Sequence, residues 1–79
     1  MESLTLRELQ RPEKLERILA HKDRLAIYDH LQEYGSLTVS NLYFLTLLEK
    51  SVIRNHLIIL IRAKLIKEST YQGQITYEA

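Results

Sequence analysis

The sequence predicts a mainly α-helical domain of the α+β class, in which the helices come first and a two-stranded hairpin comes last. Apolar residues recur at helical spacing up to about residue 63, and the C-terminal residues alternate polar and apolar around Gln72-Gly73. The 79 residues suffice for one domain. Because so short a chain buries only about 60% of its unfolded surface, we expect self-association to add to the core.

Residues 1–21 are predicted to form an N-terminal helical arm. Thr5 and Glu8 have capping-box spacing, and Pro12 suits the first position of a helix. The arm carries more leucine than a solvated helix needs, so we expect it to mediate dimerisation through Leu4, Leu6, Leu9, Leu15, Ile18 and Leu19. The alternative is that Leu15, Ile18 and Leu19 only cover the protein's own core.

A second helix is expected over about 22–34, with Gly35 ending it in the left-handed conformation that glycine tolerates best. Its expected core contacts are Leu25, Ile27, Tyr28 and Leu31. Residues 36–39 then form a short extended link.

The third and fourth helices follow in quick succession. The third is expected over about 41–45, capped by Thr38 or Ser40, with Leu42 and Leu45 facing inward. The segment Thr46-Leu47-Leu48-Glu49 is a second capping-box pattern, so the fourth helix is predicted over about residues 47–63. Its buried residues are expected to be Ile53, Leu57 and Leu60.

The C-terminal segment is predicted to form a hairpin within about residues 65–78. Residues 67–71 are extended, Gln72-Gly73 is a plausible two-residue turn, and residues 74–77 alternate as a half-buried strand does. Two short consecutive helices followed by a hairpin are typical of a helix-turn-helix with a wing.

Charge is unevenly distributed along the chain, although the net charge is only +1. Residues 46–67 carry five basic side chains against one acidic side chain, a balance of +4, while residues 68–79 carry two acidic side chains and no basic one. A local cluster of positive charge attracts phosphate more than the overall balance suggests. The cluster coincides with the fourth predicted helix.

Several segments resemble the winged helix-turn-helix domain of ArsR-like and MarR-like transcription regulators. They are the stretch LTVSNL at 37–42, the stretch SVIRNHL at 51–57, and Leu60, Ala63, Leu65 and Ile66; the stretch DRLAIYDHL at 23–31 is similar to the family's upstream helix. The resemblance covers about residues 20–77. It implies a DNA-binding domain over residues 22–79 and a transcription regulator that binds double-stranded DNA as a homodimer.

The outward face of the fourth helix supplies the candidate DNA contacts. Arg54 can bond guanine and Asn55 adenine with two hydrogen bonds each, while Lys50 and Ser51 suit phosphate or base contacts. The full candidate set is Lys50, Ser51, Arg54, Asn55 and Arg62 on the helix, and Lys67, Tyr71, Gln72 and Gln74 in the wing. The alternative is that these residues are only the solvated face of a surface helix.

Two features depart from the family's pattern. No glycine lies between the two helices, and no arginine or lysine lies at the wing tip, Gln72-Gly73-Gln74. The uncharged tip, together with Val52, Ile58 and Ile61, which we expect to be exposed, favours an alternative function as a protein–protein interaction module.

Other function classes find little support in the sequence. There is no cysteine, and the three histidines, His21, His30 and His56, are scattered, so no metal, cofactor or small-molecule ligand is implied. His56 is interpreted as a structural residue at the edge of the core, in preference to a metal ligand or a catalytic base, and His21 and His30 are interpreted in the same way. No catalytic set is recognisable, so we do not expect an enzyme.

The sequence also gives expectations for the cellular location and the origin of the protein. The longest apolar run has five residues against the roughly 20 that span a bilayer, so no membrane association is expected. Without a signal peptide or cysteine, the protein is expected to be intracellular and cytoplasmic. The composition would suit a heat-adapted organism and resembles that of small regulators from archaeal viruses and plasmids.

Overall fold

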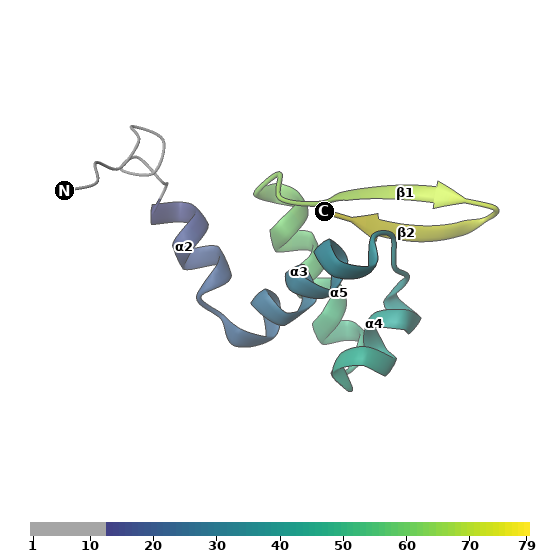
Figure 1. Cartoon of the computed structure of the whole chain (residues 1–79), viewed down its shortest axis with the longest axis horizontal. Coiled ribbons are helices and arrows are strands. Elements are labelled where there is room, and N and C mark those ends of the chain that lie inside the picture. The colour runs from purple at the N-terminus through teal and green to yellow at the C-terminus, as the bar shows by residue number, and fades with distance from the viewer. Residues whose placement is uncertain (1–12) are drawn as a thin grey trace.

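The computed structural model describes residues 13–79, with side chains from residue 16 onward. In this part of the chain, helices precede a two-stranded antiparallel sheet (Figure 1). The elements are α2 (Glu13–Leu19), α3 (Lys22–Tyr34), α4 (Val39–Thr46), α5 (Lys50–Arg62), β1 (Lys67–Tyr71) and β2 (Gln74–Glu78). The predictions for Leu4, Leu6, Leu9 and Pro12, and for the side chain of Leu15, lie outside the described residues.

Helix α3 has the predicted bounds, but α4 begins two residues earlier than expected. Gly35 follows α3 with φ 84° and donates its N–H to the carbonyl of Leu31. Thr38 caps α4: its Oγ1 accepts from the Asn41 N–H, and the Asn41 Oδ1 accepts from the Thr38 N–H, both at 3.0 Å. This reciprocal pair satisfies the helix start at Val39, so the extended link is shorter than predicted.

The predicted capping box at residues 46–49 is wrong, and α5 begins at Lys50, three residues later than expected. The Thr46 hydroxyl instead donates to the Leu42 carbonyl at 2.7 Å and accepts from the Leu48 N–H at 3.2 Å. Glu49 precedes α5 without a side-chain cap, and Leu47 takes the left-handed conformation with φ 61°. The connection between α4 and α5 therefore has a left-handed leucine where the regulators that the sequence resembles often have glycine.

The hairpin has the predicted turn. Strands β1 and β2 pair from Lys67 with Glu78 to Tyr71 with Gln74, and both turn residues, Gln72 and Gly73, have positive φ. Such a turn matches the right-handed twist of the strands. The base of the wing is attached to the helices by two backbone hydrogen bonds between Leu37 and Tyr77, of 2.8 and 3.0 Å.

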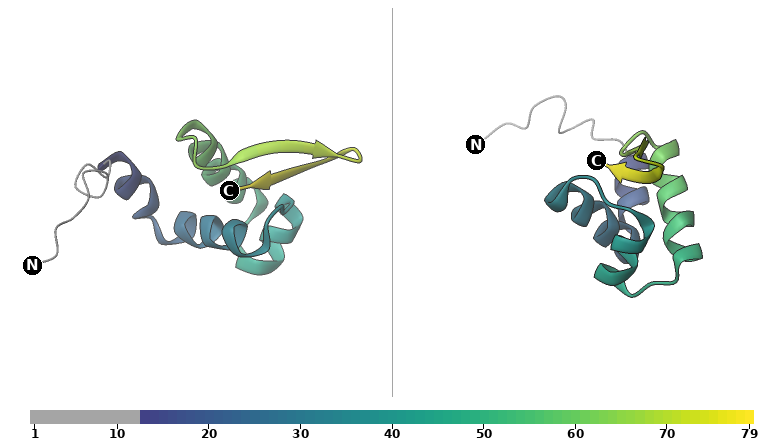
Figure 2. Two further views of the ribbon diagram at one scale, coloured as in Figure 1. Left: turned by 45° about the horizontal axis from the view of Figure 1, so that its top comes forward. Right: turned by 90° about the vertical axis from the view of Figure 1, so that its right-hand side faces the viewer.

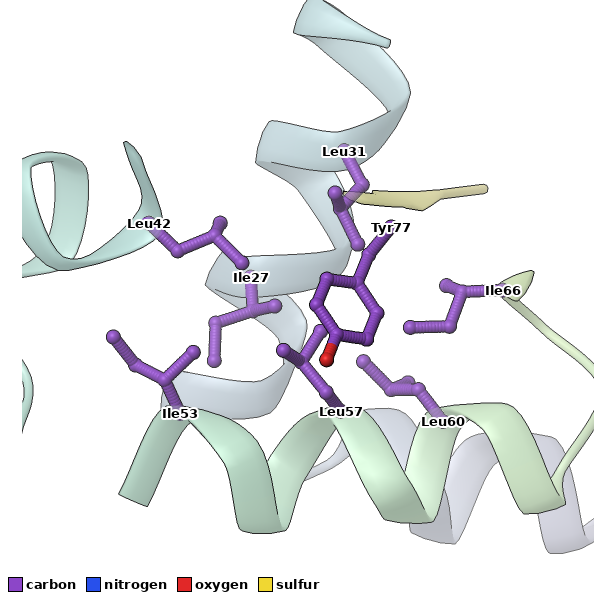
Figure 3. Packing of buried hydrophobic residues seen from close by; sticks show 8 residues of the cluster. All are labelled: Ile27, Leu31, Leu42, Ile53, Leu57, Leu60, Ile66 and Tyr77. Atoms are coloured by element: carbon purple, nitrogen blue, oxygen red, sulfur yellow. The ribbon is translucent and has the colours of Figure 1, made fainter. Parts of the chain in front are cut away.

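One small core holds the helices and the wing together (Figure 3). It includes the predicted seam of α5, and the aromatic ring of Tyr77 brings β2 into the same cluster. Its buried members are Ile27, Leu31, Leu42, Ile53, Leu57, Leu60, Ile66 and Tyr77.

Two core predictions are wrong. Leu25 is 38% exposed and Leu45 is 40% exposed. Leu25 lies about 200° around α3 from the buried Ile27, because each residue turns a helix by about 100°. Leu45 lines an open groove at the surface together with Tyr34 and Phe44, so it is only partly covered. Tyr28 is half-buried and packs against the core cluster.

Helix α2 and the wing tip lie at opposite ends of the molecule (Figures 1 and 2). Ile18 and Leu19 of α2 are half-buried and pack against the core cluster. Within residues 13–79, no helix has the length and apolar character needed to cross a membrane.

Candidate nucleic-acid interface

The predicted contact residues of α5 all lie on its exposed face. Lys50, Ser51, Arg54, Asn55 and Arg62 are exposed, whereas Ile53 and Leu57 are buried. At about 100° per residue, Lys50 and Arg54 form one stripe along the helix, and Ser51, Asn55 and Arg62 form a second. Arg62 is the last residue of α5, about 12 Å along the axis from Arg54.

Arg54 faces the wing and the start of α4. It lines an open groove of about 350 Å³ that joins three elements. The lining residues are Thr38, Val39, Ser40, Arg54, Gly73, Gln74, Ile75 and Tyr77. The structure therefore brings Arg54 together with Gln74, two candidates that are twenty residues apart in the sequence.

Sequence reasoning missed that the start of α4 belongs to this groove. From the sequence alone, Thr38 and Ser40 are expected only as helix caps. A helix N-terminus carries partial positive charge and N–H groups that favour anions such as phosphate. The signal was present in the Thr38–Asn41 capping box, which fixes where α4 begins, but the proximity to Arg54 depends on how α4 crosses α5.

Lys50 is placed beside an aromatic ring. Its Nζ lies 5.9 Å from the centre of the Tyr43 ring, a cation–π distance that holds the ammonium near the start of α5. Tyr43 was not among the sequence candidates.

The wing candidates lie at two different places. Tyr71, Gln72 and Gln74 are exposed at or beside the tip, next to the groove. Lys67 lies at the base, where its Nζ is 3.4 Å from a carboxylate oxygen of Glu78. The structure thus separates Lys67 from the other wing candidates.

His56 is buried on the core side of α5, as a structural histidine would be. Arg24 donates its Nε–H to the Nδ1 of His56 at 3.3 Å. Burial lowers the pKa of His56 below its ordinary value of 6.5, the Arg24 guanidinium and the neighbouring His21 lower it further, and the Asp23 carboxylate raises it in part. The imidazole is therefore neutral at pH 7.

The expectation that the histidines are scattered is wrong for two of the three. The possible ligand atoms of His21, Asp23 and His56 all lie within 4.8 Å of one another. His30 lies apart, stacked on Tyr34 with a centroid distance of 6.0 Å.

Exposed apolar side chains gather around α4 rather than on α5. Val52 and Ile58 are exposed as expected, but Ile61 is half-buried and packs against the core, contrary to expectation. Phe44 and Leu47 are each 76% exposed. An apolar groove beside α4 is lined by Tyr34, Leu37, Asn41, Phe44 and Leu45.

Comparison with known proteins identifies the architecture. No protein-family model matches the sequence, and no curated protein matches it significantly. Two solved structures match the chain. NolR from Sinorhizobium fredii has 23% sequence identity and a TM-score of 0.77, over 100% of this chain and 81% of NolR. Reduced HlyU from Vibrio cholerae N16961 has 25% identity and a TM-score of 0.77, over 92% of this chain and 80% of HlyU.

The chain has the winged helix-turn-helix fold. Within this fold, α4 and α5 are the helix-turn-helix pair, and β1 and β2 are the wing. The predicted mainly helical α+β class is confirmed, and so is the resemblance to winged-helix regulators that the sequence suggested. In the winged helix, α5 is the second helix of the pair, the one that enters the major groove in proteins that read DNA this way.

Proposed function

We propose that this winged-helix protein is a regulator of transcription that binds double-stranded DNA in a sequence-specific manner. Both structural neighbours are DNA-binding transcription regulators, which supports the assignment. The observation that carries the proposal is the placement of Arg54 in a groove shared by α5, the start of α4 and the wing. A cation beside a helix N-terminus and amide side chains is suited to a phosphodiester backbone and the base edges next to it.

In the proposed complex, α5 lies in the major groove. Asn55 and Ser51 form one stripe towards the base edges, and Arg54 reaches either a guanine or a phosphate at the edge of the groove. The start of α4 and Lys50 hold the phosphate backbone, while Gln72, Gln74 and Tyr71 meet the backbone or the minor groove. Arg62 and Lys67, at greater distance, add to the long-range attraction.

We further propose that residues 1–21 form the dimerisation arm and residues 22–79 the DNA-binding domain. A two-fold dimer would present its two recognition helices about 34–36 Å apart, and the binding site would be a palindrome with matching half-site spacing. An intracellular location follows from this function.

The test is DNA binding as a function of salt. A duplex selected from a random pool should bind with a log–log salt slope of about −0.9 per neutralised phosphate. Arg54→Ala should weaken binding by about 1–3 kcal/mol, and Arg54→Lys should keep most of the salt slope but relax the base preference. The matched control is Arg17→Ala, which removes an exposed arginine of α2.

A salt-insensitive complex would contradict the proposal, and so would equal effects of Arg54→Ala and Arg17→Ala. Fluorescence anisotropy over a series of salt concentrations measures both quantities.

The apolar groove beside α4 favours a second candidate, a winged-helix module that binds another protein without DNA. Phe44 lines this groove and Leu47, the residue that follows α4, is equally exposed, and contiguous exposed apolar surface is typical of protein-binding sites. If this function holds, a partner should be retained at high salt and after nuclease treatment, and Phe44→Ser should release it while Arg54→Ala should not.

A further inference from the structure

The elbow between α2 and α3 brings together three potential metal ligands outside the nucleic-acid interface. His21 precedes α3, Asp23 lies in its first turn, and His56 reaches them from the middle of α5. Their ligand atoms lie within 4.8 Å of one another, and the rings of His21 and His56 are 4.7 Å apart between centroids. His21 is exposed, Asp23 is half-buried and His56 is buried, so the cluster opens to solvent on one side.

We propose that His21, Asp23 and His56 bind a divalent transition-metal ion of the zinc type, and that the ion displaces Arg24 from His56. Two imidazoles and one carboxylate are a common zinc ligand set, and three protein ligands leave a fourth position for water. A tetrahedral site with bonds of about 2.0–2.2 Å needs ligand atoms roughly 3.3 Å apart. Since His21 is exposed, a change of its rotamer can close the remaining gap.

Arg24 occupies the place of a cation in this cluster. Its Nε–H donates to the Nδ1 of His56 at 3.3 Å, so the proton of the neutral ring lies on Nε2. A metal bound at Nδ1 would take the position of the Arg24 donor. A metal bound at Nε2 would move the ring proton to Nδ1, where it would face the same donor. In both cases the Arg24–His56 hydrogen bond is lost when the metal binds.

The same arginine attaches α2 to this elbow. The Nη1 of Arg24 donates to the carbonyl of Ile18 at 3.0 Å. Displacement of Arg24 would therefore alter the contact between α2 and α3, and with it the direction of the arm. His56 lies about 200° around α5 from Arg54, so the metal would bind away from the nucleic-acid interface.

The first experiment titrates Co²⁺ into tag-free protein and follows the visible d–d absorption, with Zn²⁺ affinity measured by competition. One ion per chain is expected. His21→Ala and Asp23→Asn should each weaken binding by on the order of 100-fold, because each removes one of three ligands, and loss of a group that only supports a ligand already costs about 10–100-fold in affinity. His30→Gln, which removes a histidine of α3 outside the cluster, is the matched control.

Arg24→Gln should tighten metal binding by on the order of tenfold, because it removes a positive charge a few ångströms from the ion. A merely structural arginine would not give this result. The proposal is overturned if Co²⁺ gives no saturable signal, if His21→Ala and His30→Gln behave alike, or if Arg24→Gln leaves the affinity unchanged or weaker. His21 and Asp23 are not buried, so their variants are expected to fold; circular dichroism checks this.

The consequence for DNA rests on the proposed function. If α2 sets the spacing of two recognition helices, Zn²⁺ should change the affinity for a selected duplex in the wild type and not in His21→Ala. Absence of any DNA binding would refute the proposed function and leave the Co²⁺ titration to decide the metal site. Equal DNA binding with and without Zn²⁺, in a protein that binds Co²⁺, would overturn the link between metal and DNA.

Discussion

At the scale of single residues, Tyr77 connects the wing to the core. Its ring packs among Leu57, Leu60 and Ile66, and its backbone pairs with Leu37 (Figure 3). Burial raises the pKa of Tyr77 above its ordinary value of 10.0, the Glu68 carboxylate raises it further, and Arg54 lowers it in part. The same side chain thus lies against the core and beside the groove of the proposed interface.

This pKa predicts a loss of stability at high pH. The unfolded chain releases the Tyr77 proton near pH 10 and the folded chain releases it only at higher pH, so the unfolded state binds fewer protons above pH 10. The free energy of unfolding should fall by up to about 1.4 kcal/mol per pH unit in that range. Tyr77→Phe should show a shallower fall. Urea unfolding at a series of pH values measures the free energy of unfolding of both proteins. Identical slopes of this free energy against pH would refute the prediction.

At the scale of elements, the connection between α4 and α5 contains local strain. Leu47 has φ 61° and is 76% exposed, so its side chain gains little burial in return for an unfavourable backbone conformation. An L-residue with a β-carbon pays roughly 1–2 kcal/mol in the left-handed region. The Leu47 N–H still closes α4 by donating to the Tyr43 carbonyl at 2.7 Å.

Leu47→Gly is therefore expected to stabilise the protein by about 0.5–1 kcal/mol, since relief of strain exceeds the added entropy of the unfolded chain. Thermal unfolding followed by circular dichroism gives the measurement. Gly35→Ala is the opposite control, because Gly35 also has positive φ and alanine should cost stability there. A Leu47→Gly protein that is less stable than wild type would show that Leu47 makes a contact that offsets its strain.

At the scale of the whole molecule, the core is small for a chain of this length. Eight apolar residues are buried in the described part of the chain, while large apolar side chains such as Leu25 and Phe44 are exposed. A second subunit would cover more of this surface. The arm proposed for that role joins the domain at the elbow where Arg24 contacts the carbonyl of Ile18.

The dimerisation proposal predicts self-association that depends on the arm. Sedimentation equilibrium should give a dimer, and the melting temperature should rise with protein concentration, because association stabilises the folded state. Replacement of Leu4, Leu6 and Leu9 together by serine should shift the equilibrium to monomer, whereas Arg54→Ala should not. A wild-type protein that stays monomeric at high concentration would refute the proposal.

The sequence by itself determined the elements with strong local signals. Gly35 and Gln72-Gly73 mark positions where the backbone needs positive φ, and the spacing of Ile53, Leu57 and Leu60 fixes which face of α5 is buried. These features depend on residues close together in the chain. For the same reason, the exposed face with Lys50, Ser51, Arg54 and Asn55 could be predicted.

Only the tertiary structure decided which distant residues meet. The position of Arg54 beside the start of α4 and the wing depends on how the helices cross, and so does the cluster of His21, Asp23 and His56. Crossing geometry results from the packing of many side chains at once and leaves no periodic pattern in the sequence. The predicted capping box at 46–49 is wrong for a local reason: the Thr46 hydroxyl donates to the Leu42 carbonyl, one turn earlier in its own helix.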